Sequence, residues 1–418
     1  MYSVTFGDGF DILRDKDGLK YDPPQWLDNS TPLDGDNGGK NDHNYPYLYC
    51  AGKKLNIIEA KWKLLPGFHI PKGTIVKVKG IISFGSKIIN LSETDAEVDL
   101  IGGWIKIGGA VASDPFEAKT QYYPDLTIEW HIKCGCGVWS NAGSSSHIIY
   151  VCLKDPPSVK LYRTVVHLAC SNAGATDPNS ALEKSWALFN NANAGPANVL
   201  GWNEETQSWD RPLYYYKPGT TFNYSENPLT VEGLLHVGSS ECIGWALFFQ
   251  QVLLVNGVKS DYNVAKPVEG TLLLVKDWAE LVEGGRFYFQ SAAVDMSPYP
   301  LSGSPPTPDP YGYYDRGNNK YFKNLQTVPG QNSNNLDAIK IPPFPKYPNA
   351  PSQKIFNNHQ FIKYNHIYYD PSYGLKYTSE QDFQNQAIAG FGRNSNVILG
   401  QSTFIFFTKS SNNIIFSV

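Results

Sequence analysis

Alternating apolar and polar positions dominate the first part of the chain. Segments with this pattern are separated by glycine and proline and include residues 73–83, 96–107, 126–132 and 147–153. A period of two predicts β-strands with one buried face. Because such segments follow one another from about residue 47 to 155, we expect an antiparallel sandwich or barrel.

Helical periodicity begins only after Pro156-Pro157. Residues 179–190 carry an apolar stripe, with Ser180 as a candidate N-cap. Residues 240–255 are apolar nearly all round, which is typical of a buried helix.

Further strands are predicted at 270–276, 285–290 and within 397–416. The chain is therefore predicted to be α+β. We expect an all-β, sandwich-like domain at 1–157 and an α+β domain at 158–418.

Composition narrows the class of protein. Hydrophobic residues make up 41% of the 418 positions and charged residues 18%, which excludes global disorder. The net charge of −4 gives no basic excess for a nucleic-acid partner. No apolar run is long enough for a membrane span. The N-terminus shows no signal peptide pattern, although low charge and abundant Tyr, Asn and Gly favour an extracytoplasmic location.

Cys242 lies in the first turn of the predicted helix at 240–255. Helix N-termini stabilise thiolates, and their N–H groups can bind an oxyanion. Ser239 or Ser240 can cap this helix, and Gly257 can end it in a left-handed conformation. Glu241 opposes a thiolate because like charges repel.

A hairpin is predicted around residues 358–374. A two-residue turn at Tyr364-Asn365 places His359 opposite Asp370, close enough for a hydrogen bond that orients the imidazole. His366 is the alternative base, but it sits beside the turn, about 13 Å along the strand from Asp370. A nucleophile, a base and an orienting carboxylate are the parts of thiol-dependent acyl transfer.

Three short segments carry these residues: Gly238-Ser239-Ser240-Glu241-Cys242, His359-Gln360-Phe361 and Tyr369-Asp370-Pro371-Ser372-Tyr373-Gly374. They resemble the core motifs of the transglutaminase-like superfamily, which belongs to the papain-like fold class. The resemblance covers roughly residues 165–400 and implies a Cys-His-Asp triad, a thioester at Cys242 and no cofactor. Members include crosslinking transamidases, cysteine proteases and peptide N-glycanases.

Two features depart from the superfamily's compact members. The chain between Cys242 and His359 is longer, and Pro-rich insertions at 299–318 and 328–353 account for this. Small bacterial members often carry Gly-x-Cys before the helix, whereas Glu241 lies directly before Cys242 here. The resemblance also implies an oxyanion helper, for which the spacing suggests Trp209, with Trp202 nearby.

The sequence also contains candidate ligands for zinc and calcium. His131, Cys134, Cys136, His147 and Cys152 cluster in sequence, but Cys134-Gly135-Cys136 is too short for the usual zinc spacing. Asp- and Gly-rich loops at 8–18 and 34–42 offer oxygen ligands for calcium without a full EF-hand pattern. We therefore expect no metal, and buried thiols or a disulfide among the cysteines.

The leading hypothesis is an enzyme that cleaves or transfers amide acyl groups of a protein or peptide substrate. Water as acceptor makes it a protease or amidase, and an amine makes it a transamidase. A catalytically inactive module that binds protein or glycan is the alternative, with Cys242 as a buried core residue. A glycopeptide-directed amidase is a third hypothesis.

Overall fold

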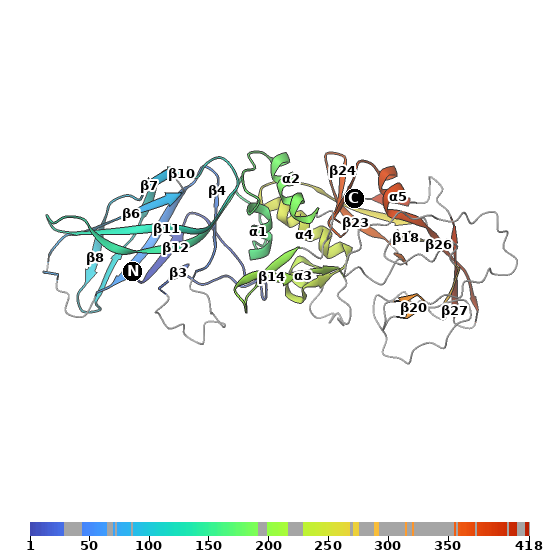
Figure 1. The fold of residues 1–418 in the computed structure, drawn as a ribbon, viewed down its shortest axis with the longest axis horizontal. Helices are drawn as coiled ribbons and strands as arrows, with labels where there is room; N and C mark the ends of the chain where they lie inside the picture. Colours follow the sequence, from blue (N-terminus) through green and yellow to red (C-terminus); the bar gives the residue numbers. More distant parts are fainter. Residues whose placement is uncertain are drawn as a thin grey trace. The chain divides into compact units, whose positions relative to one another are not determined.

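The chain has a mixed α+β fold (Figure 1). The computed structural model describes residues 1–28, 44–64, 70–71, 73–84, 87–190, 199–215, 229–267, 271–275, 288–291, 314–315, 320–321, 355–356, 358–372, 374–398, 401–407 and 414–417. A large curled sheet forms the N-terminal part, and helices and smaller sheets follow.

The N-terminal sheet has twelve strands in the order β2-β4-β12-β11-β6-β8-β9-β5-β1-β3, with β10 beside β5 and β7 beside β6. The strands are β1 (Ser3–Gly7), β2 (Phe10–Asp11), β3 (Trp26–Leu27), β4 (Tyr47–Cys50), β5 (Lys54–Lys63), β6 (Val76–Phe84), β7 (Lys87–Asn90), β8 (Thr94–Asp99), β9 (Trp104–Ile107), β10 (Ala110–Pro115), β11 (Gln121–Cys134) and β12 (Ser140–Cys152). The strands predicted at 73–83, 126–132 and 147–153 are confirmed.

The segment 96–107 is a hairpin where one continuous strand was predicted. Asp99 pairs with Trp104, and Gly103 between them adopts a left-handed φ of 72°. Asp99 Oδ1 accepts hydrogen bonds from the N–H groups of Ile101 and Gly102, which closes the turn. Strand β8 also pairs with β6, so the strands join into one curled sheet. Of the two expected arrangements, a sandwich or a barrel, the sandwich would have kept two separate sheets.

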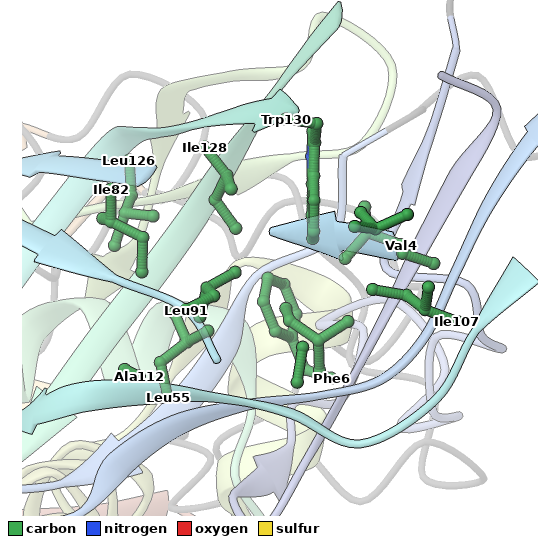
Figure 2. Close-up of a cluster of buried hydrophobic side chains, with 14 of the residues drawn as sticks. Val4, Phe6, Leu55, Ile82, Leu91, Ile107, Ala112, Leu126, Ile128 and Trp130 are labelled. Carbon is green, nitrogen blue, oxygen red and sulfur yellow. The ribbon is translucent and has the colours of Figure 1, made fainter. Parts of the chain in front are cut away.

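The apolar face of each strand points into the space that the curled sheet encloses. Figure 2 shows side chains from β6, β10, β11 and other strands meeting there, among them Trp130, Ile128 and Phe6. These three residues are buried. The apolar positions of the alternating pattern therefore lie on the inner face of the sheet.

A polar chain crosses this core. Trp130 Nε1 donates to Ser145 Oγ at 2.9 Å, and Ser145 Oγ lies 2.7 Å from Nε2 of the buried His147. An indole nitrogen only donates, whereas a hydroxyl can accept twice and donate once, so Ser145 can donate to His147 or accept from it. Burial lowers the pKa of His147 to about 3, so the ring is neutral at pH 7.

The pKa of His147 predicts an acid-dependent loss of stability. The unfolded chain binds a proton on His147 below about pH 6.5, whereas the folded chain does so only near pH 3, so stability falls as the pH drops through this window. We expect His147→Gln, which keeps an acceptor for Ser145, to remove about 2 kcal/mol of the stability difference between pH 7 and pH 4.5.

Urea unfolding of wild type and variant at both pH values measures this difference. His366→Gln is the control, because His366 is exposed at a hairpin turn. Identical pH dependence of wild type and His147→Gln would show that His147 is not the titrating group.

The six cysteines carry free thiols in the structure. Cys50 and Cys152 are direct partners on the parallel strands β4 and β12, with their Sγ atoms 3.4 Å apart in the core. Cys134 and Cys136 lie exposed between β11 and β12. The expectation of buried thiols therefore holds for Cys50 and Cys152 but not for the Cys134-Cys136 pair.

Two helices follow the large sheet, α1 (Arg163–Cys170) and α2 (Pro178–Phe189). Helix α2 confirms the helix predicted at 179–190 but begins earlier. Asp177 Oδ1 accepts from the N–H groups of Asn179 and Ser180, so Asp177 is the N-cap and the expected cap, Ser180, lies inside the helix. Pro178 occupies the first helical position, where a missing N–H does not matter.

The remaining elements form smaller sheets and three helices. The helices are α3 (Val231–Val237), α4 (Cys242–Val255) and α5 (Glu380–Ala387). One five-stranded sheet has the order β25-β24-β23-β17-β28, built from β25 (Leu375–Tyr377), β24 (Ile367–Asp370), β23 (His359–Tyr364), β17 (Asp261–Pro267) and β28 (Ile414–Ser417).

A second five-stranded sheet has the order β19-β27-β26-β18-β22. Its strands are β19 (Tyr288–Ser291), β27 (Gln401–Phe407), β26 (Ile388–Ile398), β18 (Thr271–Val275) and β22 (Ile355–Phe356). Three pairs complete the set: β13 (Leu200–Asn203) with β14 (Ser208–Pro212), β15 (Tyr214–Tyr215) with β16 (Ser239–Ser240), and β20 (Tyr314–Asp315) with β21 (Lys320–Tyr321).

Contacts divide the chain into two compact units. The first comprises Met1–Leu188, Trp202–Asp210 and Gln251–Val258, and the second comprises Phe189–Gly201, Arg211–Gln250 and Lys259–Val418. The domain boundary predicted at 157 falls inside the first unit. The three predicted site residues, Cys242, His359 and Asp370, all belong to the second unit.

Candidate functional site

Cys242 is the first residue of helix α4 and is 4% exposed. The residue before it, Glu241, accepts from the N–H of Trp245 and therefore occupies the N-cap position. Ser239 and Ser240, the expected caps, form strand β16 and pair in parallel with β15 instead. The sequence correctly placed Cys242 in the first turn, where free N–H groups and the helix dipole favour negative charge.

Aromatic packing holds this end of α4 in place. Trp245, Phe248 and Phe249 are fully buried and surround the ring of Phe189, with centroids 4.8–6.4 Å from it. Phe249 also contacts Tyr369, the residue before Asp370, at 6.1 Å. The apolar residues of α4 therefore pack against more than one neighbour, and these contacts fix the helix against the strand that carries Asp370.

The hairpin β23–β24 turns one residue later than predicted. Tyr364 pairs with Ile367, and the two residues between them, Asn365 and His366, have φ values of 46° and 68°. Two positive φ angles define a type I′ turn, whose twist suits a hairpin. The predicted turn at Tyr364-Asn365 and the direct pairing of His359 with Asp370 are therefore wrong.

His359 and Asp370 nevertheless meet. Continuing the observed register places Asp370 opposite Phe361, so His359 lies two residues away on the same face. His359 Nε2 is 2.7 Å from Asp370 Oδ2, and both side chains are buried. On the other side of β23, the small Ala265 is the direct partner of His359.

The Asp370 carboxylate governs the charge of His359. Burial alone would lower the pKa of His359, because it penalises the charged form. Burial is the largest single influence, but the charge and hydrogen bond of Asp370, together with the hydrogen bond and charge of Cys242, outweigh it, and the pKa of His359 rises to about 10. His359 is therefore an imidazolium at neutral pH, next to both Asp370 and Cys242.

Three neighbours of this site were not singled out by the sequence. Tyr377 on β25 donates to Asp370 Oδ2 at 3.3 Å, and Phe383 on α5 stacks flat against the imidazole of His359 with centroids 6.0 Å apart. Gln360 Oε1 accepts from Cys242 Sγ at 3.5 Å. Only the aromatic nature of Tyr377 and Phe383 hinted at burial, and nothing in the sequence distinguished Gln360.

Removing the Tyr377 hydroxyl is expected to weaken the fold. Tyr377→Phe leaves Asp370 with one donor fewer in a buried place, which costs about 1–2 kcal/mol. Tyr368→Phe is the matched control, because Tyr368 is the direct strand partner of Tyr377 and donates to Glu380 nearer the surface. Thermal unfolding of both variants measures the difference. Equal destabilisation would contradict a special role for the Tyr377–Asp370 bond.

The other predicted candidates lie elsewhere. Trp209 belongs to the first unit, where its ring stacks on His167 with centroids 3.7 Å apart and meets Trp202 edge-on at 5.1 Å. Its role as an oxyanion helper stays a prediction. His366 is exposed in the hairpin turn, away from the buried face that carries His359.

The residues considered as metal ligands do not form a site in the described part of the chain. Among the described residues, no group of three His, Cys, Asp or Glu side chains is arranged to hold a metal ion. In the loop at 8–18, Asp11 pairs with Lys20 at 3.0 Å and Asp17 with Arg14 at 2.8 Å. The loop at 34–42 lies outside the described residues.

Comparison with known proteins adds no relative. No family model matches the chain, and no curated protein is similar to it. Within the described ranges, no helix is both long and apolar enough to cross a lipid bilayer.

Proposed function

We propose that the protein transfers acyl groups from amide bonds through a thioester at Cys242, as a cysteine hydrolase or a transamidase. The observation that carries the proposal is the buried His359–Asp370 pair at 2.7 Å, with Cys242 of α4 beside the same imidazole. A positively charged imidazole next to sulfur favours the thiolate, which is the nucleophilic form.

The charges suggest how the proton moves. The Cys242 thiolate attacks the amide carbonyl, the S–C bond forms, and His359 gives its proton to the departing amine. Acylation removes the negative charge of sulfur, which is one of the causes of the raised pKa of His359. The imidazole therefore releases its proton more readily at this stage. Neutral His359 then takes a proton from water or an acceptor amine, whose oxygen or nitrogen bonds to the acyl carbon. The S–C bond breaks, and the thiolate and the imidazolium are restored.

The likeness to the transglutaminase-like superfamily, with its papain-like fold, is part of the proposal. Its support is the chain order Cys242, His359, Asp370, the thiol at a helix start, and the base and carboxylate on one hairpin. The substrate is a protein or peptide on this proposal. The inactive binding module remains the alternative, and Glu241 beside Cys242 favours it.

A generic acyl donor tests the proposal without a known substrate. The exposed Cys134 and Cys136 would react with any such reagent, so the parent protein carries Cys134→Ser and Cys136→Ser. We expect p-nitrophenyl acetate to leave one acetyl group on the peptide that contains Cys242, and added water or primary amine to remove it. Peptide mass spectrometry reads the site. Failure to acetylate Cys242 in the folded parent favours the inactive module.

A further inference from the structure

The side chain of Gln360 lies against the sulfur of Cys242. Its Oε1 accepts from Sγ at 3.5 Å, and its Nε2 donates to Asn358 Oδ1 at 2.6 Å. Gln360 and Asn358 are both partly buried. A neutral carboxamide, held by a second one, therefore faces the atom that forms the thioester on the proposed function.

Acyl transfer needs a hydrogen-bond donor close to the sulfur of Cys242. When sulfur attacks a carbonyl, the carbonyl oxygen becomes an oxyanion two bonds from sulfur, and it needs donors at roughly 2.7–3.1 Å. A group within 3.5 Å of Sγ is in range of that position. Cys242 also begins α4, and the first-turn N–H groups of a helix have no intrahelical partners, so they are further candidate donors.

The amide pair can present either end to sulfur. A carboxamide has an acceptor at one end and donors at the other. If both carboxamides turn over, Asn358 Nδ2 donates to Gln360 Oε1, their mutual hydrogen bond is kept, and Gln360 Nε2 points towards Cys242. The thiol favours the arrangement with oxygen towards sulfur. An oxyanion repels that oxygen and favours the N–H donors.

We infer that Gln360 is a catalytic residue that donates a hydrogen bond from Nε2 to the oxyanion, with Asn358 holding its carboxamide. The inference rests on the proposed acyl transfer at Cys242. The two carboxamides turn as the oxyanion forms, which brings the donor end of Gln360 to the charged oxygen.

Two reagents separate this role from a structural one. Acetylation by p-nitrophenyl acetate passes through an oxyanion, whereas alkylation by iodoacetamide is a direct displacement at carbon without one. In the parent with Cys134→Ser and Cys136→Ser, Gln360→Ala is expected to slow acetylation of Cys242 by at least tenfold, towards the roughly 10²–10³-fold loss typical of one oxyanion donor. Alkylation of Cys242 is expected to stay within about twofold of the parent, as direct displacement places no charge on an oxyanion.

Two further variants make the result decisive. Gln360→Met keeps the length of the side chain without a donor and is expected to show the same selective loss. Gln386→Ala, at an exposed glutamine of α5, is expected to change neither rate. Unchanged acetylation in Gln360→Ala and Gln360→Met, or an equal fall in both rates, overturns the inference while the proposed function stands. If Cys242 of the parent is not acetylated at all, the proposed function fails and this inference fails with it.

Discussion

Replacing Cys242 by alanine is expected to reduce acetyl transfer from p-nitrophenyl acetate by roughly 10⁴- to 10⁶-fold, the range seen when a member of a catalytic triad is removed. The reason is that, on the proposed function, the thioester forms at this sulfur, and His359 and Asp370 act only through it. Cys242 begins a helix that is fixed by buried aromatic rings, so losing one sulfur atom leaves the surrounding packing in place.

A matched control accompanies this variant. Cys170 is also a fully buried helical cysteine, but it lies in α1 of the first unit. Cys170→Ala is expected to keep the parent rate, measured as release of p-nitrophenol in the background without Cys134 and Cys136. Acetyl transfer that survives in Cys242→Ala and maps to another residue would contradict the assignment of the nucleophile.

Replacing Asp370 by asparagine is expected to slow acetyl transfer by about 10³- to 10⁴-fold, as when the carboxylate of a triad loses its charge. Asp370 and Cys242 together outweigh burial and hold the pKa of His359 at about 10, and Asp370 is the larger of these two influences. Without the charge of Asp370, burial is opposed less and the pKa of His359 falls. A smaller fraction of His359 is then an imidazolium that can pair with the thiolate.

The same substitution is expected to change the pH dependence of stability. Because the folded-state pKa of His359 is raised, its stabilising contribution is complete below about pH 6.5 and is lost as the pH rises towards 10. Asp370→Asn removes this loss, so the variant's stability should vary less between pH 7 and pH 10. Asp382→Asn, at the partly buried start of α5, is the control. Parent-like pH profiles in Asp370→Asn would contradict the charge coupling between the two residues.

Strands and helices could be predicted from the sequence where a hydrophobic pattern has a single physical explanation. Apolar alternation located β6, β11 and β12, because each has an inner and an outer face. Apolar residues all round predicted the buried α4, and Gly257 ends that helix as expected with a φ of 69°. The same alternation did not distinguish two sheets from one curled sheet, because strands have an inner face in both. The pairing of β8 with β6 and β9 decided this.

The sequence predicted that His359 and Asp370 meet on one hairpin, but not the register in which they meet. Two adjacent turns were compatible with the pattern around Asn365. The one that formed places Asn365 and His366 at positive φ, which is uncommon for residues other than glycine, although Asn and His adopt it more often than most. The contact between Gln360 and Cys242 could not be predicted from the sequence either. Alternation along β23 directs Gln360 away from the face of His359, and only the position of α4 brings Cys242 close to it.

The most direct test of the central claim is the rate at which iodoacetamide alkylates Cys242 as a function of pH, in the parent without Cys134 and Cys136. On the proposed function an imidazolium at His359 pairs with the thiolate, so alkylation at pH 6 is expected to be much faster in the parent than in His359→Gln. A rate at pH 6 that His359→Gln leaves unchanged would contradict the account.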